Sequence, residues 1–268
     1  MLRRRLLNKK GIDYSGAVVG DILCSDLSFV TRANYASSGK TGIGVIVHNA
    51  NRTLRVIAKN QFKDRWSPSL SDVPGIANVN YNTYANDMDG DGNTTKIIAH
   101  FGTSQNYAAR SCRSYAPSGV GQGLWYLPAS GELKLINTSN INTINDSNIA
   151  IGGGIIRMRE YSQTVNFAVW YGEGNLAEDT TTEHFYYLYR SSSEYDLNKT
   201  PKMYRETDNT IYVNTDIAME DMTEKVNTDY YDYVEWQPYW VSGWPSEVWF
   251  RDHYYLEYYY FPFLKIEY

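Results

Sequence analysis

Residues 42–58 read GIGVIVHNANRTLRVIA, and this stretch decides the fold class. Two runs rich in β-branched residues, 42–48 and 54–58, flank the polar segment Asn49-Ala50-Asn51-Arg52. Runs of this kind, separated by a short polar turn, are typical of two antiparallel strands joined as a hairpin. The sequence therefore predicts an antiparallel sheet.

Further strands and a few helices are predicted around this hairpin. Residues 104–115 and 132–144 place apolar side chains at helical spacing, and residues 216–226 read as a short acidic helix. Residues 59–95 are rich in Asn, Asp, Pro and Gly, which favours a long irregular segment anchored in the core by Trp66. Because strands do not alternate regularly with helices, we expect an α+β domain with antiparallel pairing. The other predicted strands are residues 16–25, 155–161, 166–171, 185–189 and 210–214.

The composition favours a globular protein. An apolar content of 43% can supply a core to 268 residues, as one large domain or two small ones. The net charge of −5 and the isoelectric point near 5.4 offer no basic field to a phosphate backbone. The apolar runs are far shorter than the roughly 20 residues of a membrane helix. We therefore expect neither nucleic acid as a partner nor membrane insertion.

The first residues form a distinct basic segment. Residues 1–14 contain three Arg and two Lys but few large apolar side chains, so they read as a basic, poorly ordered arm. Only two leucines follow the arginines before polar residues intervene, which is too short for the apolar region of a signal peptide. We expect a chain made in the cytoplasm and not exported by that route.

Patterns of catalytic residues are absent from the sequence. Its four histidines are dispersed, and it has no nucleophile-elbow, phosphate-loop or dinucleotide-binding motif. Cys24 and Cys112 lie in apolar surroundings and read as buried free thiols, with a bridge or a reactive thiol as the alternative. We expect no enzymatic activity and no cofactor.

One acidic stretch resembles half of a calcium loop. Asp87, Asp89 and Asp91 stand at the first three ligand positions and Gly92 at the sixth, but Ile98 stands where the loop needs a bidentate acid. The alternative is a tight turn in which Asp and Asn side chains bond their own backbone. Calcium is the only metal candidate, and its ligand set is incomplete.

Aromatic residues dominate the end of the chain. Residues 230–268 hold ten of the 25 tyrosines and four of the seven tryptophans. Consecutive strand residues point to opposite faces, so runs such as Tyr254-Tyr255 must leave some rings outside a one-sided core. Tyr and Trp also suit binding surfaces, including sugar faces, whereas the alternative is core and subunit packing. The predicted binding face comprises Tyr233, Trp236, Tyr239, Trp240, Trp244, Trp249, Tyr254, Tyr255 and Tyr258.

Several short motifs occur in an order that matches a known family. The most specific is the run WYLPASGEL at residues 125–133. The others are Gly20-Asp21-Ile22, KTGIGVIV at residues 40–47, Asp89-Gly90 with Asn93-Thr94, Ala108-Ala109 with Cys112, Ser191-Ser192-Ser193-Glu194, and Pro262-Phe263-Leu264-Lys265-Ile266. Over about residues 16–268 the chain resembles the C-type-lectin-like "major paralogous domain" of Bacteroidetes surface proteins and of their gut phages, including crAss-like phages.

The resemblance implies a C-type-lectin-like α+β fold with antiparallel sheets, two main helices and long loops. It divides the chain into a basic arm, residues 1–14, and a lectin-like domain, residues 15–268, with an insertion around 155–185 and an aromatic segment at 230–268. Some members of the family bind no calcium, so the resemblance implies that the acidic turn has a structural role. Phe261 stands where the family has Arg before the closing Pro.

The resemblance also carries a functional expectation. Bacterial members usually have a lipoprotein signal, which this sequence lacks, so a phage virion component is favoured over a bacterial surface adhesin. We expect a tail or capsid fibre or decoration protein, homo-oligomeric and bound to other virion proteins, that attaches to host-surface glycan or protein. The alternatives are a purely architectural virion protein and an enzyme akin to formylglycine-generating lectin-like enzymes. Such enzymes rely on thiols, and no Cys follows Cys112.

Overall fold

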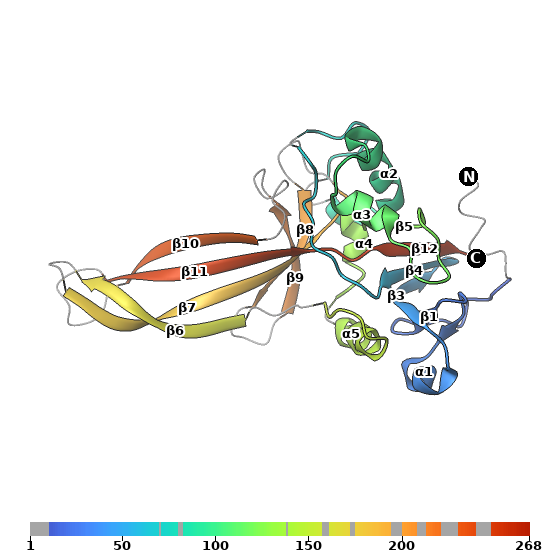
Figure 1. The fold of residues 1–268 in the computed structure, drawn as a ribbon, viewed down its shortest axis with the longest axis horizontal. Coiled ribbons are helices and arrows are strands. Elements are labelled where there is room, and N and C mark those ends of the chain that lie inside the picture. The colour runs from blue at the N-terminus through green and yellow to red at the C-terminus, as the bar shows by residue number, and fades with distance from the viewer. Residues whose placement is uncertain are drawn as a thin grey trace.

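The structure is a computed structural model. It describes residues 11–69, 71–79, 83–137, 139–156, 161–171, 175–193, 200–207, 213–220, 230–239 and 248–268. Side chains are described within residues 11–156, at Tyr189, at 191–193 and at 259–268. The described strands form two sheets of six strands each. We use "the base" for residues 11–156 and 259–268, which carry the first sheet and its helices (Figure 1).

The first sheet is entirely antiparallel and lies at the centre of the base. The predicted hairpin is confirmed, because β3 (Gly42–Ala50) pairs with β4 (Thr53–Ala58) around a turn at Asn51 and Arg52, which both have positive φ. The last strand of the chain, β12 (Phe263–Glu267), inserts between β4 and β5 (Trp125–Tyr126). The sheet order is β2-β1-β3-β4-β12-β5, with β1 at Ile22–Cys24 and β2 at Phe29–Val30.

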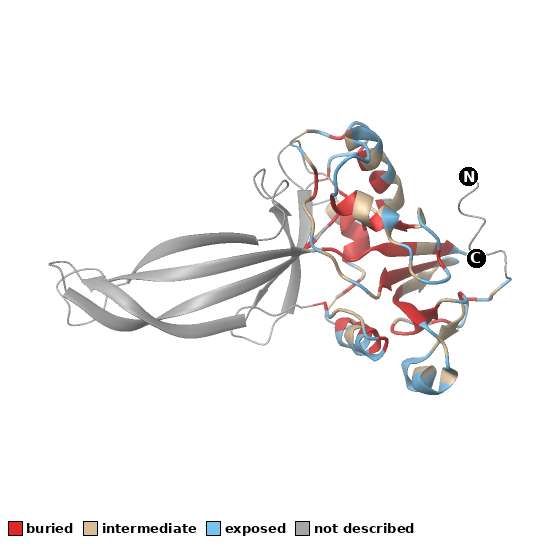
Figure 2. Ribbon diagram, viewed as in Figure 1, coloured by how far each residue is buried: buried red, intermediate tan, exposed pale blue. Residues whose placement is uncertain are grey.

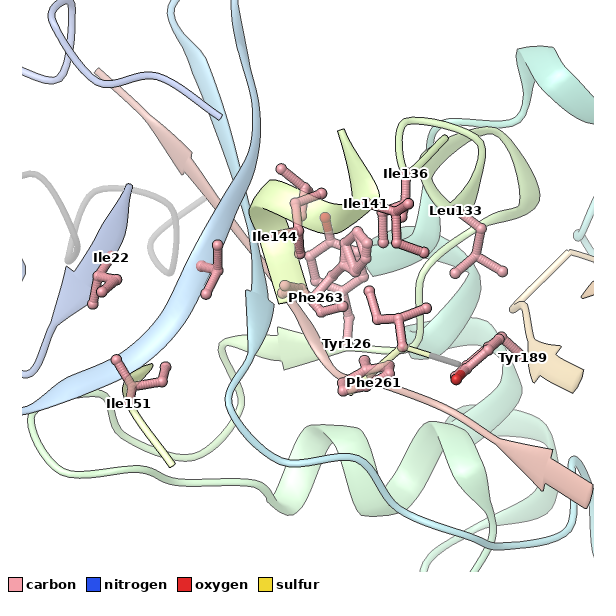
Figure 3. Packing of buried hydrophobic residues seen from close by; sticks show 14 of the residues in the cluster. Ile22, Tyr126, Leu133, Ile136, Ile141, Ile144, Ile151, Tyr189, Phe261 and Phe263 are labelled. Atoms are coloured by element: carbon pink, nitrogen blue, oxygen red, sulfur yellow. The ribbon is translucent and has the colours of Figure 1, made fainter. Parts of the chain in front are cut away.

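Both faces of this sheet are buried. Alternate residues of β4 and β12 enter two apolar clusters, with Ile57 and Phe263 in one cluster, and Val56 and Leu264 in the other. Figure 3 shows the first cluster, in which Phe263 and Tyr126 of the sheet lie near three isoleucines of the segment after β5. These are Ile136, Ile141 and Ile144. Figure 2 shows that buried residues are concentrated along these central strands. A sheet buried on both faces explains why these strands read as nearly continuous apolar runs.

Short helices cover the base. A third apolar cluster joins α2 (Gly90–Phe101) and α3 (Ala108–Ser114) through Ile97 and Cys112, and it includes Trp66, which is fully buried. The predicted anchoring role of Trp66 is therefore confirmed. The remaining helices are α1 (Arg32–Ser38), the 3-10 helix η1 (Tyr84–Asn86), α4 (Ser130–Leu133) and α5 (Ile141–Ala150).

Two predicted helices differ from the observed ones in their bounds. The helix predicted at 104–115 begins only at Ala108, because the Ala108 amide donates to the carbonyl of Arg65 (2.8 Å) and Tyr107 is extended. The single helix predicted at 132–144 is wrong, since α4 and α5 are separate. Between them the Asn140 side chain donates to the Leu135 carbonyl (2.8 Å), an alternative to helical backbone bonding that Asn side chains offer.

The acidic turn opens a helix that the sequence reading missed. The irregular segment predicted at 59–95 ends instead at α2, and Asp89 caps this helix by accepting from the Gly92 amide (3.2 Å). A Cβ atom at Gly90 would lie 2.3 Å from Glu132 Oε2, so only glycine lets the helix start approach the α4 segment this closely. The helix α1 was likewise not predicted.

The second sheet is built from the middle and late parts of the chain. It has the order β10-β11-β7-β8-β9, and β6 also pairs with β7. Figure 1 shows β6, β7, β10 and β11 extending away from the base, with none of the described helices over them. The strand bounds are β6 (Tyr161–Tyr171), β7 (Asn175–Arg190), β8 (Thr200–Thr207), β9 (Val213–Glu220), β10 (Tyr230–Tyr239) and β11 (Val248–Tyr259).

The sheet departs from the predictions in two respects. β7 and β11 pair in parallel, because both strands return towards the base, where they end at Arg190 and Tyr259. The acidic helix predicted at 216–226 is wrong over its described part, since residues 213–220 form β9 in register with β8. Cross-strand pairing overrides the local helical pattern there. The α+β class with predominantly antiparallel pairing is confirmed.

The other predicted strands agree in part. Residues 166–171 lie in β6 and 185–189 lie in β7, as expected. The strand predicted at 16–25 is limited to Ile22–Cys24. Of the segment predicted at 155–161 only Tyr161 is in a described strand, and of 210–214 only the last two residues are.

Candidate binding surface

The aromatic residues predicted to bind lie mainly on the last two strands of the second sheet. Seven of the nine occupy β10 and β11, whereas Trp240 and Trp244 lie outside the described residues. Those on β10 are Tyr233, Trp236 and Tyr239, and those on β11 are Trp249, Tyr254, Tyr255 and Tyr258.

The strand register divides these seven residues between two faces. Tyr233 is the direct cross-strand partner of Tyr254, and directly opposed residues share a face. Counting in steps of two along the strands adds Tyr239 and Tyr258 to that face, which we call the tyrosine face. Trp236, Trp249 and Tyr255 occupy the opposite face. The seven residues therefore do not form one continuous surface.

The pairing with β7 adds aromatic residues that the sequence reading did not select. Tyr186 is the register partner of Leu256, and Leu256 is also the partner of Tyr231 on β10, so both tyrosines belong to the tyrosine face. The run FYYLYR at residues 185–190 carried the signal, since its alternate residues must share a face. Reading each strand alone could not show that β7 lies beside β11.

The second sheet joins the base at a buried junction, which we define as Tyr189, residues 191–193 and residues 259–261. Trp66 Nε1 donates to the Ser191 carbonyl (2.8 Å), and the Ser192 amide donates to the Pro128 carbonyl (2.7 Å). Ser193 Oγ donates to Asp87 Oδ2 (2.6 Å) and accepts from the Ser130 amide (2.8 Å). These bonds fix the end of β7 to the helical side of the base.

Aromatic contacts form the other half of the junction. Tyr189 and Tyr259 are register partners in β7 and β11, and their ring centroids lie 6.1 Å apart. Tyr189 also stacks on Phe261 (5.7 Å), and both belong to the apolar cluster beside α5. The sheet face that carries Tyr189 and Tyr259 therefore turns towards the base at this end. The tyrosine face is the reverse of that face.

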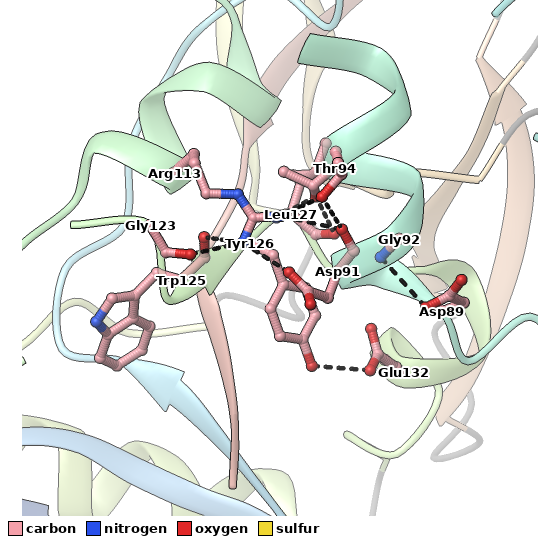
Figure 4. Close-up of polar contacts among 11 residues, drawn as sticks. Asp89, Asp91, Gly92, Thr94, Arg113, Gly123, Trp125, Tyr126, Leu127 and Glu132 are labelled. Carbon is pink, nitrogen blue, oxygen red and sulfur yellow. Dashed lines mark hydrogen bonds and ion pairs between the residues drawn. The ribbon is translucent and has the colours of Figure 1, made fainter. Parts of the chain in front are cut away.

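On the base side of the junction, the segment WYLPASGEL contains the buried carboxylate of Glu132, which accepts three hydrogen bonds. Arg55 Nε donates to Glu132 Oε1 (2.9 Å), and the Tyr126 hydroxyl donates to the same oxygen (2.8 Å). The Ala129 amide donates to Glu132 Oε2 (3.0 Å). Burial raises the pKa of Glu132, and the bonds from Arg55 and Ala129 act against this rise. Figure 4 shows Tyr126 pointing to Glu132.

A second polar network supports the same segment from α3. The Arg113 guanidinium donates to the carbonyls of Gly123 and Trp125 and pairs with Asp91 Oδ1 (2.6 Å), as Figure 4 shows. Thr94 of α2 exchanges hydrogen bonds with the backbone of Leu127. The junction thus rests on a base segment that is fixed by buried polar contacts on both sides.

The acidic residues proposed for calcium serve separate structural roles. Asp87 accepts from Ser193 and from Asn93 Nδ2 (2.9 Å), Asp89 caps α2, and Asp91 pairs with Arg113. Within the described part of the chain no group of three acidic, His or Cys residues could hold a metal ion. The alternative reading, in which acidic side chains bond nearby backbone, describes Asp89.

The described thiols are both free and buried, as the first of the two sequence readings predicted. Burial raises the pKa of the Cys112 thiol well above its ordinary value, and the pKa of Cys24 is raised for the same reason. A raised pKa lowers the thiolate fraction, which is the nucleophilic form. Neither group has the surroundings of a reactive thiol.

Comparisons with known proteins leave the chain without an assigned family. No family model, curated protein or solved structure matches the sequence. Among the described residues, no helix is long and apolar enough to cross a membrane. Function must therefore be argued from the surface and the junction.

Proposed function

We propose that this chain is a structural protein of a bacteriophage virion, a tail or capsid fibre or decoration component, and that its lectin-like domain attaches the virion to a host-surface glycan or protein. The observation that carries the proposal is the tyrosine face, where Tyr233 and Tyr254 stand directly opposed on strands that extend from the base. Tyrosine rings offer apolar area and a hydroxyl, a combination that suits sugar rings and protein hot spots. The family resemblance described above supports the virion context.

The junction supports a display role for the second sheet. The opposite face turns towards the base at Tyr189 and Tyr259, and Lys63 Nζ lies 4.8 Å from the Tyr259 ring centroid. A ring held between a neighbouring ring and a cation has little freedom to move. A sheet anchored in this way presents the tyrosine face in a fixed orientation, which lowers the entropic cost of binding.

The test compares the two faces of the second sheet. The variant Tyr233→Ala, Tyr239→Ala, Tyr254→Ala should bind Bacteroidetes cells at least roughly tenfold more weakly than the unmodified chain, because aromatic hot-spot residues contribute about 2 kcal/mol or more. The matched control Trp236→Ala, Trp249→Ala, Tyr255→Ala changes three aromatic residues on the opposite face. Cell binding is measured by flow cytometry of the labelled full chain, with circular dichroism as a check on folding. Equal binding by both folded variants and the parent would refute the attachment role.

A purely architectural role is the second candidate. The observation that favours it is that none of the described helices covers β6, β7, β10 and β11, whereas a sheet ordinarily packs against another layer. In that case the tyrosine-face variant would abolish incorporation into virions, and the isolated parent would bind no cells. Incorporation at the parental level, together with lost cell binding, would exclude this candidate.

A further inference from the structure

Charge is distributed very unevenly between the parts of this chain. Residues 157–258 contain 8 Lys or Arg and 19 Asp or Glu. The base is nearly balanced, with 12 cationic and 11 acidic residues, and residues 1–10 carry five cations and no acid. The modest net charge of the whole chain therefore conceals an acidic second sheet with its connections and a basic terminal arm.

The strand register places two of these acids side by side. Glu235 of β10 and Asp252 of β11 are direct cross-strand partners, and like charges in that arrangement destabilise a sheet. The neighbouring rows on the same face pair Tyr233 with Tyr254 and Gln237 with Phe250, and Tyr254 is also the register partner of His184 on β7, so these rows contain no Lys or Arg. A cation brought by another segment would relieve this repulsion.

Among the described strands, β10 is an edge strand. β10 is the first strand in the sheet order and pairs only with β11 among the described strands. Pro238 lies within β10, and proline is tolerated on edge strands because it has no amide hydrogen to donate. An approaching chain can therefore reach the Glu235–Asp252 row from the outer side of β10.

The position of the basic arm indicates which copy it would reach. Ile12 and Tyr14 pack into the base core beside Tyr268, and the rings of Tyr14 and Tyr268 lie 5.6 Å apart. Figure 1 shows the C-terminus on the side of the base that lies away from the second sheet. The first described residues therefore lie at that end of the base, while the second sheet extends from the other end.

We propose that residues 1–10 of one copy bind the Glu235–Asp252 row of the second sheet of another copy. The contact joins two different surfaces, so it builds rings or open filaments unless two copies exchange arms reciprocally. It rests on the proposed function only in that a virion component must assemble, and it assigns the arm to a second copy of this chain. This row lies on the tyrosine face beside the Tyr233–Tyr254 pair, so a bound arm and a host ligand would compete for that face.

Salt dependence and paired charge reversal test this contact on the full chain. Self-association, measured by sedimentation velocity over a range of concentrations, should weaken as salt rises, because salt screens exposed charges. The variant Arg3→Glu, Arg4→Glu should weaken self-association at least about tenfold, since like-charge contacts at an interface cost several kcal/mol. The control Lys96→Glu, Arg110→Glu makes the same change in net charge within the base and should associate like the parent.

The decisive measurement is complementation. The variant Glu235→Lys, Asp252→Lys should also fail to self-associate, but its mixture with the arm-reversed variant should associate again, because each arm then meets a sheet of opposite charge. Glu235→Gln, Asp252→Asn serves as a milder variant if the lysine form does not fold, and it should weaken association at low salt. Failure of the folded mixture to associate would overturn the proposal, as would a parent that stays monomeric while its arm binds a short oligonucleotide. Absence of cell binding by a parent that does self-associate would count against the attachment role alone.

Discussion

The base and the second sheet differ in what holds them and in what they offer to other molecules. The base encloses a two-sided sheet between apolar clusters and balances its charges, whereas residues 157–258 contain 23 of the 40 aromatic residues and a large excess of acids. Repulsion among acidic side chains opposes a compact structure, whereas aromatic side chains favour contact with other molecules. The described apolar clusters stabilise the base, whereas the interactions that we propose belong to the second sheet, and the junction connects the two.

The largest effect should come from removing the buried carboxylate of the base. Glu132→Ala leaves Arg55, whose side chain is 8% exposed, without its charged partner, and takes acceptors from Tyr126 and Ala129. Breaking a buried ion pair on one side costs about 3–5 kcal/mol of unfolding free energy. Urea unfolding followed by circular dichroism measures this loss.

The same experiment shows whether the second sheet depends on the base. If the two regions are coupled, the signal of the second sheet is lost in the same transition as that of the base. Glu267→Gln is the matched control, since its pair with Lys265 is partly exposed and such pairs contribute about 1 kcal/mol or less. A loss below 1 kcal/mol in Glu132→Ala would contradict the role given to this carboxylate.

An intermediate loss of stability is expected at the junction. Ser192 and Ser193 are adjacent there, and Ser192→Ala serves as the control for Ser193→Ala. Ser193→Ala removes the hydroxyl that bonds Asp87 and accepts from the Ser130 amide, which should cost about 1–3 kcal/mol. Ser192→Ala removes a buried hydroxyl that has no hydrogen-bond partner among the described residues, so stability should stay equal or rise slightly. Hydrogen exchange should show faster opening of β7 in the first variant only, and equal exchange in both would break the proposed coupling.

The smallest effect concerns the end of the base that lies away from the second sheet. Burial raises the pKa of Tyr14 to about 12, and its hydroxyl donates to the Leu27 carbonyl (2.8 Å). Because the pKa is higher in the folded than in the unfolded chain, this contribution to stability is complete below about pH 10 and is lost as the pH rises towards 12. Melting temperatures measured at about pH 9, 10, 11 and 12 should fall less steeply with rising pH in Tyr14→Phe than in the parent.

The parts of the fold that depend on nearby residues were predictable from the sequence. The β3–β4 hairpin followed from two apolar runs and a polar turn, and the burial of Trp66 followed from its place in an otherwise polar segment. The Asp89 cap was also readable, but its run of Gly, Asp and Asn looked like a turn and hid the start of α2. Helix propensity there is low, and packing of Ile97 into the third cluster decides the outcome.

The candidate site could be predicted only in composition. The tyrosines were evident, but their division between two faces depends on the register of β10 with β11, which the residues of either strand alone do not reveal. β7 joins the site through a parallel pairing with β11 over a gap of about 70 residues. The acidic residues 216–220 likewise satisfied a helical pattern, and pairing with β8 determined their strand conformation. In each case the pairing with another strand, and not the pattern within one segment, determines the outcome.

The short link between β11 and β12 has a mechanical consequence. Only Tyr260, Phe261 and Pro262 separate β11 of the second sheet from β12, which lies between β4 and β5 in the base. Tension applied to the outer end of β11 is therefore transmitted along β12, whose hydrogen bonds to its neighbours run perpendicular to the strands. Those bonds are loaded together in shear instead of opening one after another. A pull on the second sheet thus acts on a strand that is paired on both sides within the base.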